Sequence, residues 1–416
     1  MSYSSDVLIV GAGIGGLSLA LRLAAKGYRI RILQQREPPL PVYRPEIVQP
    51  AALQALAELG LLNRLAAKAV ARVDTFQFYR IGGTRLSRVS YRILEHPYPY
   101  TLIGLPHHTR RVLLDSLSAH SSVHIHWETR LTAVLRQGSQ VLGAKAIEGG
   151  QEQEWHAPVT VGSDGCRSRF REALGIDCRI KSYRNAFLGI LLRRPLDGDG
   201  NGELDGAVHY YLGRGEILAC FPCSSTTLCL LFMVPACAPQ TIGGQELSAL
   251  KNRLCAIAPA LDEPLNQITS WEQVSYLAPV RVRVARWVTD GATLMGDAAH
   301  ACHPHVAQGV FQAMEDSRVL AKVLETCFTR GDFSARALAP YEVTRRPVVE
   351  RLQRVADEYA WLWETKNPLF TWLRDRIFRN VGQAPELLQR IVAIEAGIET
   401  KPLTLVERLQ ALGIAA

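Results

Sequence analysis

The stretch Val7-Leu8-Ile9-Val10-Gly11-Ala12-Gly13-Ile14-Gly15-Gly16 places a short apolar run directly before a cluster of glycines. A continuous apolar run of this length is typical of a buried parallel strand. Apolar residues then recur at helical spacing between positions 17 and 24, and residues 30–33 supply a second apolar run. The first 35 residues therefore predict a strand–helix–strand unit.

The glycines form a G-x-G-x-x-G pattern at the turn between the first strand and the helix. Gly11 would make the tight turn, Gly13 would let a pyrophosphate approach the backbone, and Gly16 would allow close packing of helix on strand. The helix N-terminus offers unpaired N–H groups and the positive end of its dipole to phosphates. In this context the pattern predicts a dinucleotide-binding loop.

Gln34 ends the second strand, where such units usually carry an acidic residue that binds ribose hydroxyls. A glutamine amide can also bond a hydroxyl, but without the charge that strengthens a carboxylate's hydrogen bond. We expect Gln34 to bind the ribose more weakly than a carboxylate would.

The pattern of apolar and polar residues changes between about residues 180 and 280. Alternating and β-rich runs with Pro, Gly and Ser turns replace the helical periodicity, and α/β texture returns after 290. A chain of 416 residues is too long for a single core. We predict a discontinuous Rossmann-like α/β domain (1–75, 100–180 and 280–345) and an inserted, mostly antiparallel β domain (76–99 and 181–279). A C-terminal helical region would follow (346–416).

Two further motifs follow predicted strands. The first is the Asp164-Gly165 turn inside Val161-Gly162-Ser163-Asp164-Gly165-Cys166-Arg167-Ser168. The second is Gly296-Asp297, which leads through Pro304 to Gln308-Gly309 and a predicted helix over 306–326. We expect Asp297 to be a buried carboxylate that accepts hydrogen bonds from a sugar alcohol. The helix that begins near Gly309 would present N–H donors to a negative group.

Taken jointly, the motifs at positions 11, 164 and 296 resemble the fingerprint of the FAD-dependent aromatic hydroxylases. The segment 297–316 is most similar to the salicylate hydroxylase and zeaxanthin epoxidase branch. The resemblance runs from Val7 to about residue 350. It implies that the following residues bind the cofactor: Gly11, Gly13, Gly16, Gln34, Arg44, Arg110, Asp164, Gly165, Gly296, Asp297, Pro304, Gln308 and Gly309.

The sequence departs from this family at two positions. Gln34 stands where the family has Glu, and Ala307 stands where a glycine normally precedes Gln308-Gly309. The extra methyl group of Ala307 is expected to narrow the space above the flavin ring.

The resemblance also implies the reaction. NADH or NADPH would reduce FAD, and the reduced flavin would activate O2 as a hydroperoxyflavin that hydroxylates or epoxidises a small aromatic or fused-ring substrate. Tyr210, Tyr211 and Phe221 are candidates for lining the substrate cavity, and each could equally be an ordinary core residue. The sequence names no catalytic base.

Composition excludes several other classes of protein. The net charge of +8 comes from scattered basic residues, so neither nucleic acid nor a membrane surface is the expected partner. No apolar run is long enough to span a bilayer, and no leader precedes residue 7, so we expect a cytoplasmic protein. Cys220 and Cys223 lack a second pair and are expected to be structural. We expect no metal among His300, Cys302, His303 and His305, because no carboxylate adjoins them in the sequence.

Three rival functions remain at this point. A flavin-dependent halogenase would carry Trp-x-Trp-x-Ile-Pro, which is missing here. A flavin-linked reductase of polyprenyl double bonds is disfavoured by the match at 304–316. A ligand carrier that binds FAD weakly or not at all has only Gln34 in its favour.

Overall fold

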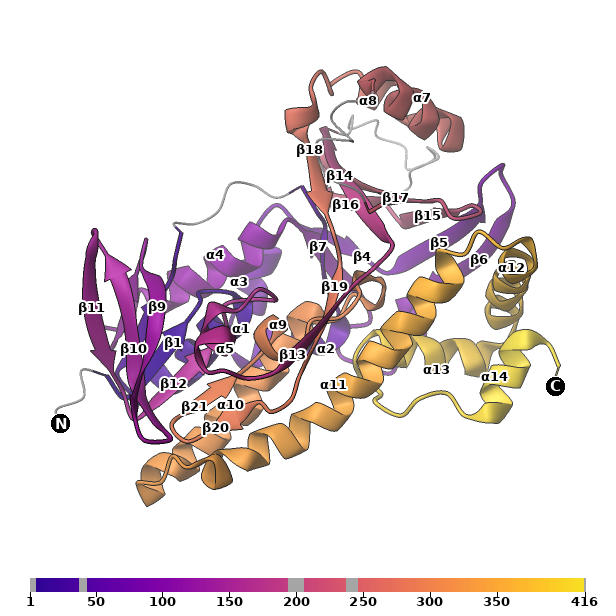
Figure 1. The fold of residues 1–416 in the computed structure, drawn as a ribbon. Helices are drawn as coiled ribbons and strands as arrows, with labels where there is room; N and C mark the ends of the chain where they lie inside the picture. The colour runs from indigo at the N-terminus through magenta and orange to yellow at the C-terminus, as the bar shows by residue number, and fades with distance from the viewer. Residues whose placement is uncertain (1–4, 37–42, 194–205, 237–245, 415–416) are drawn as a thin grey trace.

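The computed structural model describes residues 5–36, 43–193, 206–236 and 246–414. Figure 1 shows a nucleotide-binding-like α/β part on the left and a large β-sheet at the upper right, with the C-terminal helices beside and beneath that sheet. This mixed architecture, with a parallel sheet, antiparallel sheets and a helical C-terminal region, confirms the predicted fold class. The division into domains stays a prediction.

A six-stranded sheet forms the centre of the α/β part. Its order is β20 (Val288–Thr289), β21 (Ala292–Leu294), β12 (Val159–Gly162), β1 (Val7–Val10), β2 (Ile30–Leu33) and β8 (Val123–His126). All neighbours pair in parallel except β20 and β21. Every residue of β1 and β12 is buried, as expected of central parallel strands covered on both faces.

Helices cover this sheet. α1 (Ile14–Ala24) packs against α4 (Pro106–Leu117) and against α10 (Gly309–Arg330). The spacing of Leu53, Leu56 and Leu59 in the sequence predicts a single helix over residues 50–66, and this prediction is wrong. The chain forms α2 (Pro50–Glu58) and α3 (Leu62–Ala66), separated at Gly60, whose φ of 69° lies outside the helical region.

Smaller sheets surround the α/β part. One contains β9 (Arg130–Gln137), β10 (Gln140–Glu148) and β11 (Gln151–His156), and another contains β3 (Glu46–Val48), β7 (Thr101–Gly104) and β4 (Ala71–Val73). β13 (Cys178–Ser182) and β19 (Val280–Val284) form an antiparallel pair. They are the segments by which the chain enters and leaves the large sheet (Figure 1).

The large sheet has seven strands and is mostly antiparallel. Its order is β18 (Val274–Leu277), β14 (Asn185–Arg193), β17 (Thr227–Pro235), β16 (Ile217–Ser224), β15 (Val208–Leu212), β5 (Thr75–Arg80) and β6 (Arg85–Ser90). Its outer face packs on α7 (Leu247–Ile257) and α8 (Asp262–Leu265). Cys220 and Cys223 lie inside β16, where they are buried in two different apolar clusters.

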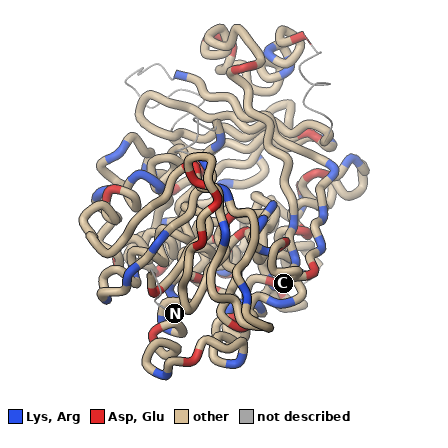
Figure 2. Tube along the Cα trace, turned by 60° about the vertical axis from the view of Figure 1, so that its left-hand side comes forward, with Lys and Arg blue, Asp and Glu red and all other residues tan. Residues whose placement is uncertain are grey.

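The C-terminal region consists of α11 (Ala335–Trp363), α12 (Pro368–Gln383), α13 (Pro385–Glu395) and α14 (Leu405–Leu412). Within the described part of the chain, no helix has the length and apolarity that a membrane crossing requires. Figure 2 shows basic and acidic residues interspersed along the trace, in keeping with a generally basic surface without one dominant patch.

A buried carboxylate joins three elements of the α/β part. Asp316 on α10 is fully buried, and its Oδ2 accepts a hydrogen bond of 2.8 Å from the backbone N–H of Gly296. Nε2 of His300 lies 2.6 Å from the same oxygen, and Nε of Arg345 on α11 donates to Oδ1 at 2.8 Å. Burial alone would raise the pKa of Asp316, but His300 and Arg345 outweigh it and hold the pKa at about 2. Asp316 is therefore an ionised anchor between α10, α11 and the turn after β21.

The turn before α10 holds a strained residue. Ala307 has φ 48° and ψ 33°, in the left-handed region that favours glycine. A residue with a Cβ adopts this conformation at a cost of roughly 1–2 kcal/mol. The glycine expected at this position would adopt it freely.

We expect Asp316→Asn to lower the free energy of unfolding by about 3–5 kcal/mol at neutral pH, because Arg345 would stay buried without its counter-ion. The difference from wild type should shrink as pH falls from about 4 toward 2, where the wild-type carboxylate itself takes up a proton. Denaturant unfolding measures both effects. Glu315→Gln on the same helix is the control and should cost less than about 1 kcal/mol. Equal losses in the two variants would contradict the anchoring role.

We expect Ala307→Gly to raise the free energy of unfolding by about 0.5–1 kcal/mol. The variant relieves the left-handed strain but makes the unfolded chain more flexible. Thermal unfolding of the variant and of Ala25→Gly, an exposed alanine with φ −60°, provides the comparison. The control should lose stability, and a loss at both positions would show that Ala307 is unstrained.

Candidate functional site

The three motifs lie at one edge of the parallel sheet. The glycine loop follows β1, the Asp164 turn follows β12, and Gly296 follows β21, three neighbouring strands. The carboxyl ends of parallel strands meet at the same edge, which is where open α/β sheets bind ligands. The three motifs, which are far apart in the sequence, therefore lie close together in space.

The glycine loop packs directly on the Asp164 turn. A Cβ at Gly11 would lie 2.3 Å from the carbonyl oxygen of Ser163, and a Cβ at Gly16 would lie 2.3 Å from that of Gly11. At Gly13 the nearest atom would be 3.8 Å away. Gly11 and Gly16 are thus required by packing, whereas Gly13 leaves open space in front of the N-terminus of α1.

Gln34 closes the other side of the glycine loop. Its Oε1 accepts a hydrogen bond of 2.8 Å from the backbone N–H of Ala12. The amide of Gln34 therefore stabilises the glycine loop, a role that the sequence did not indicate. A carboxylate at this position could accept the same N–H.

Arg110 on α4 lies near this end of the sheet. Its guanidinium is 5.7 Å from the ring centroid of Trp127, which follows β8, and its buried Nε has no hydrogen-bond partner among the residues that the structure describes. Burial lowers the pKa of Arg110, as expected for a cation that has no anion beside it. Arg44, by contrast, is exposed.

Asp164 organises its own turn. Its Oδ2 accepts a hydrogen bond of 3.0 Å from the backbone N–H of Phe170 in α5 (Arg169–Ala173), while the buried Oδ1 has no partner within the described part of the chain. Burial raises the pKa of Asp164. Gly165 has φ 86°, a left-handed conformation at which a side chain would be strained.

The expectation that Asp297 is buried is wrong. Asp297 is exposed as the first residue of the short helix α9 (Asp297–His300), and the buried carboxylate of this region is Asp316. The sequence motif contained both aspartates, but nothing in the spacing indicated which one would point inward. Asp297 is therefore available to a ligand, whereas Asp316 holds the turn that carries it.

Gln308 is tied to the protein rather than free. Its Nε2 donates to the carbonyl oxygen of Ile394 at 2.6 Å, and its Oε1 accepts from Nε2 of Gln312 at 3.0 Å. Gln312 in turn accepts a hydrogen bond of 2.5 Å from Arg345. The side chain of Gln308 is therefore not free to bind a ligand, whereas a Cβ at Gly309 would meet nothing within 4 Å.

A carboxylate from a distant part of the chain lies beside the histidines of this turn, although none adjoins them in the sequence. Glu364, just after α11, places its Oε1 3.1 Å from Nε2 of His303 and 3.0 Å from Nε2 of His305. The three ligand-type atoms lie within 4.8 Å of one another. Sequence spacing missed the group because Glu364 is some sixty residues away along the chain.

The three substrate candidates divide between the two faces of the large sheet. Tyr210 and Phe221 pack edge to face at 5.6 Å on the inner face, where Tyr210 also lies 5.7 Å from Trp363. Tyr211 points to the outer face with the cluster under α7 and α8. Neighbouring strand residues point to opposite faces, so Tyr211 does not share a cavity with the other two.

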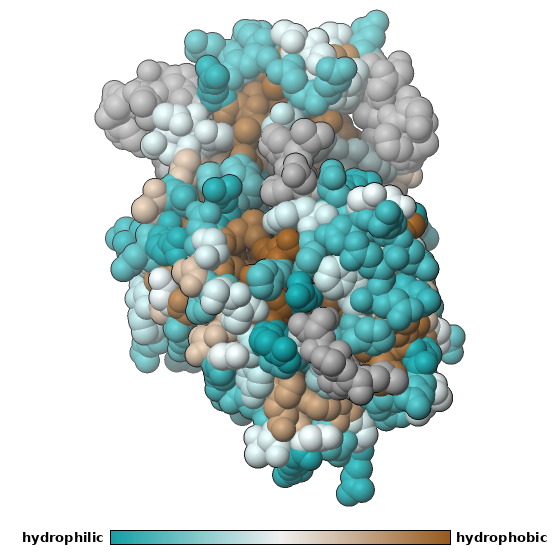
Figure 3. Space-filling view, turned by 90° about the vertical axis from the view of Figure 1, so that its left-hand side faces the viewer, coloured by the Kyte–Doolittle hydropathy of each residue, from teal (hydrophilic) through white to brown (hydrophobic). Residues whose placement is uncertain are grey.

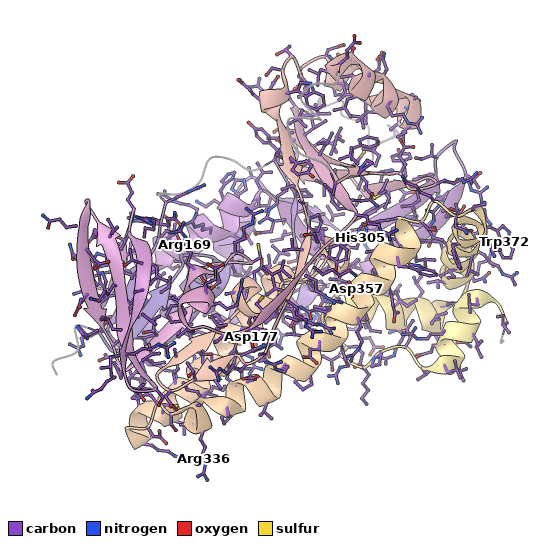
Figure 4. All side chains as sticks on the ribbon, viewed as in Figure 1. Arg169, Asp177, His305, Arg336, Asp357 and Trp372 are labelled. Atoms are coloured by element: carbon purple, nitrogen blue, oxygen red, sulfur yellow. The ribbon has the colours of Figure 1, made fainter. Side chains whose placement is uncertain are left out.

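The surface between the two parts is apolar. Figure 3 shows brown, hydrophobic residues framed by hydrophilic ones between the β-rich upper part and the α/β part. Figure 4 shows His305 where the large sheet, the α/β part and the end of α11 meet. The motif edge and the aromatic inner face thus approach one another from opposite sides.

Comparisons with known proteins agree with this geometry. Residues 4–356 match the family model of an FAD binding domain. The 6-methylpretetramide 4-monooxygenase of Streptomyces rimosus is 28% identical over 354 residues, which cover 84% of this chain and 82% of the relative. The kynurenine 3-monooxygenase of Salinispora arenicola is 28% identical over 406 residues, covering 93% of this chain and 84% of the relative.

Solved structures share the fold. The p-nitrophenol 4-monooxygenase PnpA of Pseudomonas putida DLL-E4 superposes with a TM-score of 0.80 at 18% identity, covering 97% of this chain and 100% of PnpA. The family match spans most of the chain. The matched segments cover 82% and 84% of the two relatives, which are monooxygenases. The chain belongs to the FAD-binding-domain family and is an FAD-dependent monooxygenase, an oxidoreductase that uses NAD(P)H and O2.

Proposed function

We propose that this chain binds one FAD along the motif edge and oxygenates an aromatic or fused-ring substrate held against the inner face of the large sheet. The observation that carries the proposal is the convergence of three loops on one edge, where Gly13 leaves space and polar groups lack partners. The buried Nε of Arg110 suits a phosphate of an anionic cofactor, and the buried Oδ1 of Asp164 suits a hydroxyl group that donates to it.

The roles follow from position. The pyrophosphate would lie at Gly13 and the N-terminus of α1, with Gly11 and Gly16 shaping the loop. The ribose would lie at Gln34, and Arg110 would contact a phosphate. We place the remaining contacts along the sugar-alcohol chain and the ring, at Arg44, Asp164, Gly165, Gly296, Asp297, Pro304 and the backbone of Gln308 and Gly309.

The bound flavin supplies the redox chemistry, taking electrons from NAD(P)H and passing an oxygen atom from O2 to the substrate. The protein must hold the substrate ring near the flavin and exclude water. Tyr210, Phe221 and Trp363 present aromatic surface suited to a planar substrate. The two relatives, a 6-methylpretetramide and a kynurenine monooxygenase, favour a fused-ring or aromatic substrate.

The rival functions lose their support. Gln34, which alone favoured a weakly binding carrier, accepts a hydrogen bond that keeps the glycine loop in shape. The relatives and the solved structure compared above are all monooxygenases, so none of them supports a flavin-linked reductase.

We expect the purified protein to carry or take up one non-covalent FAD per chain and to consume NADH or NADPH faster when a suitable aromatic compound is added. The measurements are flavin absorbance, cofactor consumption over a panel of aromatics, and mass spectrometry of products formed under 18O2. Incorporation of one labelled oxygen distinguishes a monooxygenase from a reductase. A well-folded protein that stays colourless in excess FAD would overturn the proposal.

We expect Gln34→Glu to tighten FAD binding by about 1 kcal/mol, roughly fivefold, because a carboxylate can accept both the N–H of Ala12 and a ribose hydroxyl more strongly. Gln34→Leu removes the acceptor oxygen for both the N–H of Ala12 and the ribose hydroxyl, so it should weaken FAD binding. Quenching of flavin fluorescence gives the affinities in one buffer. A loss of affinity in a stable Gln34→Glu protein would mean that the amide donates a hydrogen bond which the carboxylate cannot.

A further inference from the structure

The cluster of His303, His305 and Glu364, called here the His–Glu cluster, is nearly closed to solvent. The side chains are 0%, 6% and 9% exposed, respectively. Glu364 Oε1 faces both imidazoles, and Oε2 accepts a hydrogen bond of 2.9 Å from the amide of Asn185 on β14. Burial by itself would raise the pKa of Glu364, but the two histidines hold it well below its usual range. The cluster therefore contains a buried negative charge.

His303 is held in the cluster by a hydrogen bond to its Nδ1, while its Nε2 lies close to Glu364 without forming a hydrogen bond. Its Nδ1 accepts the backbone N–H of His305 at 3.4 Å, so the ring proton belongs on Nε2, which faces Glu364 at 3.1 Å. Burial, followed by the neighbouring His305, lowers the pKa of His303 to about 4. The ring is thus neutral, and with its Nε2 protonated it offers no lone pair to a metal ion there. His303 is a structural member of the cluster.

His305 differs from His303 in one respect. Its Nε2 lies 3.0 Å from Glu364 Oε1, within hydrogen-bonding distance, and among the described residues its Nδ1 has no hydrogen-bond partner. A carboxylate that holds one imidazole nitrogen fixes the tautomer and stabilises the imidazolium that forms when the other nitrogen takes a proton. The Glu364–His305 pair is therefore built as a base whose Nδ1 is available.

The position of His305 links this base to the reaction. It follows Pro304 in the turn that leads to Gly309, and its ring lies 5.7 Å from Phe187 on β14 and 5.0 Å from Trp363. The ring of Trp363 in turn packs against the ring of Tyr210 on the inner face of the large sheet. His305 thus stands between the turn proposed to face the flavin ring and the aromatic surface proposed to hold the substrate (Figure 4).

Other ionisable groups surround the pair. Asp357 of α11 is neutralised by Arg281 and Lys181 and also accepts a hydrogen bond from Tyr183. On the α13 side, Glu395 accepts a hydrogen bond of 3.1 Å from Tyr359, whose ring stacks on Trp363. Burial raises the pKa of Glu395 to about 7, so Glu395 titrates near neutral pH.

We infer that His305 is the catalytic base of this monooxygenase, positioned by Glu364, and that the substrate carries an ionisable ring hydroxyl. The inference rests on the proposed function. His305 Nδ1 takes the proton from the hydroxyl, and the O–H electron pair stays on the substrate and enriches the ring carbons beside and opposite the oxygen. One of those carbons exchanges its hydrogen for OH, with one oxygen atom from O2 and two electrons from the hydride of NAD(P)H. The second oxygen atom leaves as water, whose formation uses the displaced ring hydrogen as a proton and one further proton from solvent. The imidazolium then returns its proton to the product oxygen.

The first test needs no substrate. FAD-loaded protein labelled with 15N-histidine is compared with His305→Gln, which identifies the His305 signals in the spectrum. We expect a neutral ring protonated on Nε2 and unprotonated on Nδ1. A ring protonated on Nδ1 would overturn the inference even if the protein proves to be an active monooxygenase.

The second test uses a panel of phenols, each paired with its methyl ether. We expect oxygenation of phenols but not of the ethers, and a rate that falls at acidic pH, because a general base acts only in its unprotonated form. His305→Gln should lower kcat about a hundredfold and remove the acidic limb, since general bases contribute about this much. Glu364→Gln should lower kcat less, and both variants should retain FAD.

Glu395→Gln is the control variant and should keep the acidic limb. Loss of that limb in Glu395→Gln but not in His305→Gln would overturn the inference, as would equal oxygenation of phenols and ethers. Failure of FAD uptake would instead contradict the proposed function, and the histidine spectra would still decide whether His305 has the predicted tautomer.

Discussion

The arrangement of the site depends on one buried carboxylate. Asp316 accepts hydrogen bonds from Gly296 and Arg345 and contacts His300, so a single side chain joins the turn after β21, helix α10 and helix α11. The three bonds offset the cost of burying a charge, which is large unless the charge is fully paired. Because Asp316 is occupied inside the protein, the neighbouring Asp297 is the carboxylate left at the surface of the edge.

This anchor extends further through Arg345. Arg345 also bonds Gln312, which bonds Gln308, and Gln308 reaches the carbonyl of Ile394 at the end of α13. The 304–309 turn is therefore held from both sides, by the α/β part and by the C-terminal helices. That support explains how Ala307 can persist in a left-handed conformation, because the surrounding bonds determine the path of the chain.

The same turn presents groups of two kinds to the region between the sheets. Its backbone at Gly309 opens helix α10 without a side chain, which suits an anionic or polar ligand. Its histidines meet Glu364 from the far end of α11, which gives one imidazole an oriented tautomer. Cofactor position and proton transfer would thus be controlled by one short segment between Pro304 and Gly309.

The sequence by itself determined the parts that depend on local pattern. The strand–glycine–helix unit, the β-rich texture of 181–279 and the helical C-terminal region follow from periodicity and turn residues, and they agree with the structure. The three motifs and their family resemblance were equally local, since each lies within about twenty consecutive residues. The break at Gly60 was missed because a single glycine in an apolar periodic stretch is often tolerated within a helix.

Only the tertiary structure decided which polar groups face each other. Asp316 rather than Asp297 is buried because α10 and α11 close over it, and Glu364 meets His305 because α11 returns to the sheet. Tyr210 and Tyr211 point to opposite faces of the large sheet, because side chains alternate along a strand. Only the structure shows which apolar cluster covers each face. Such pairings depend on packing between segments distant in sequence, and no local pattern of residues records them.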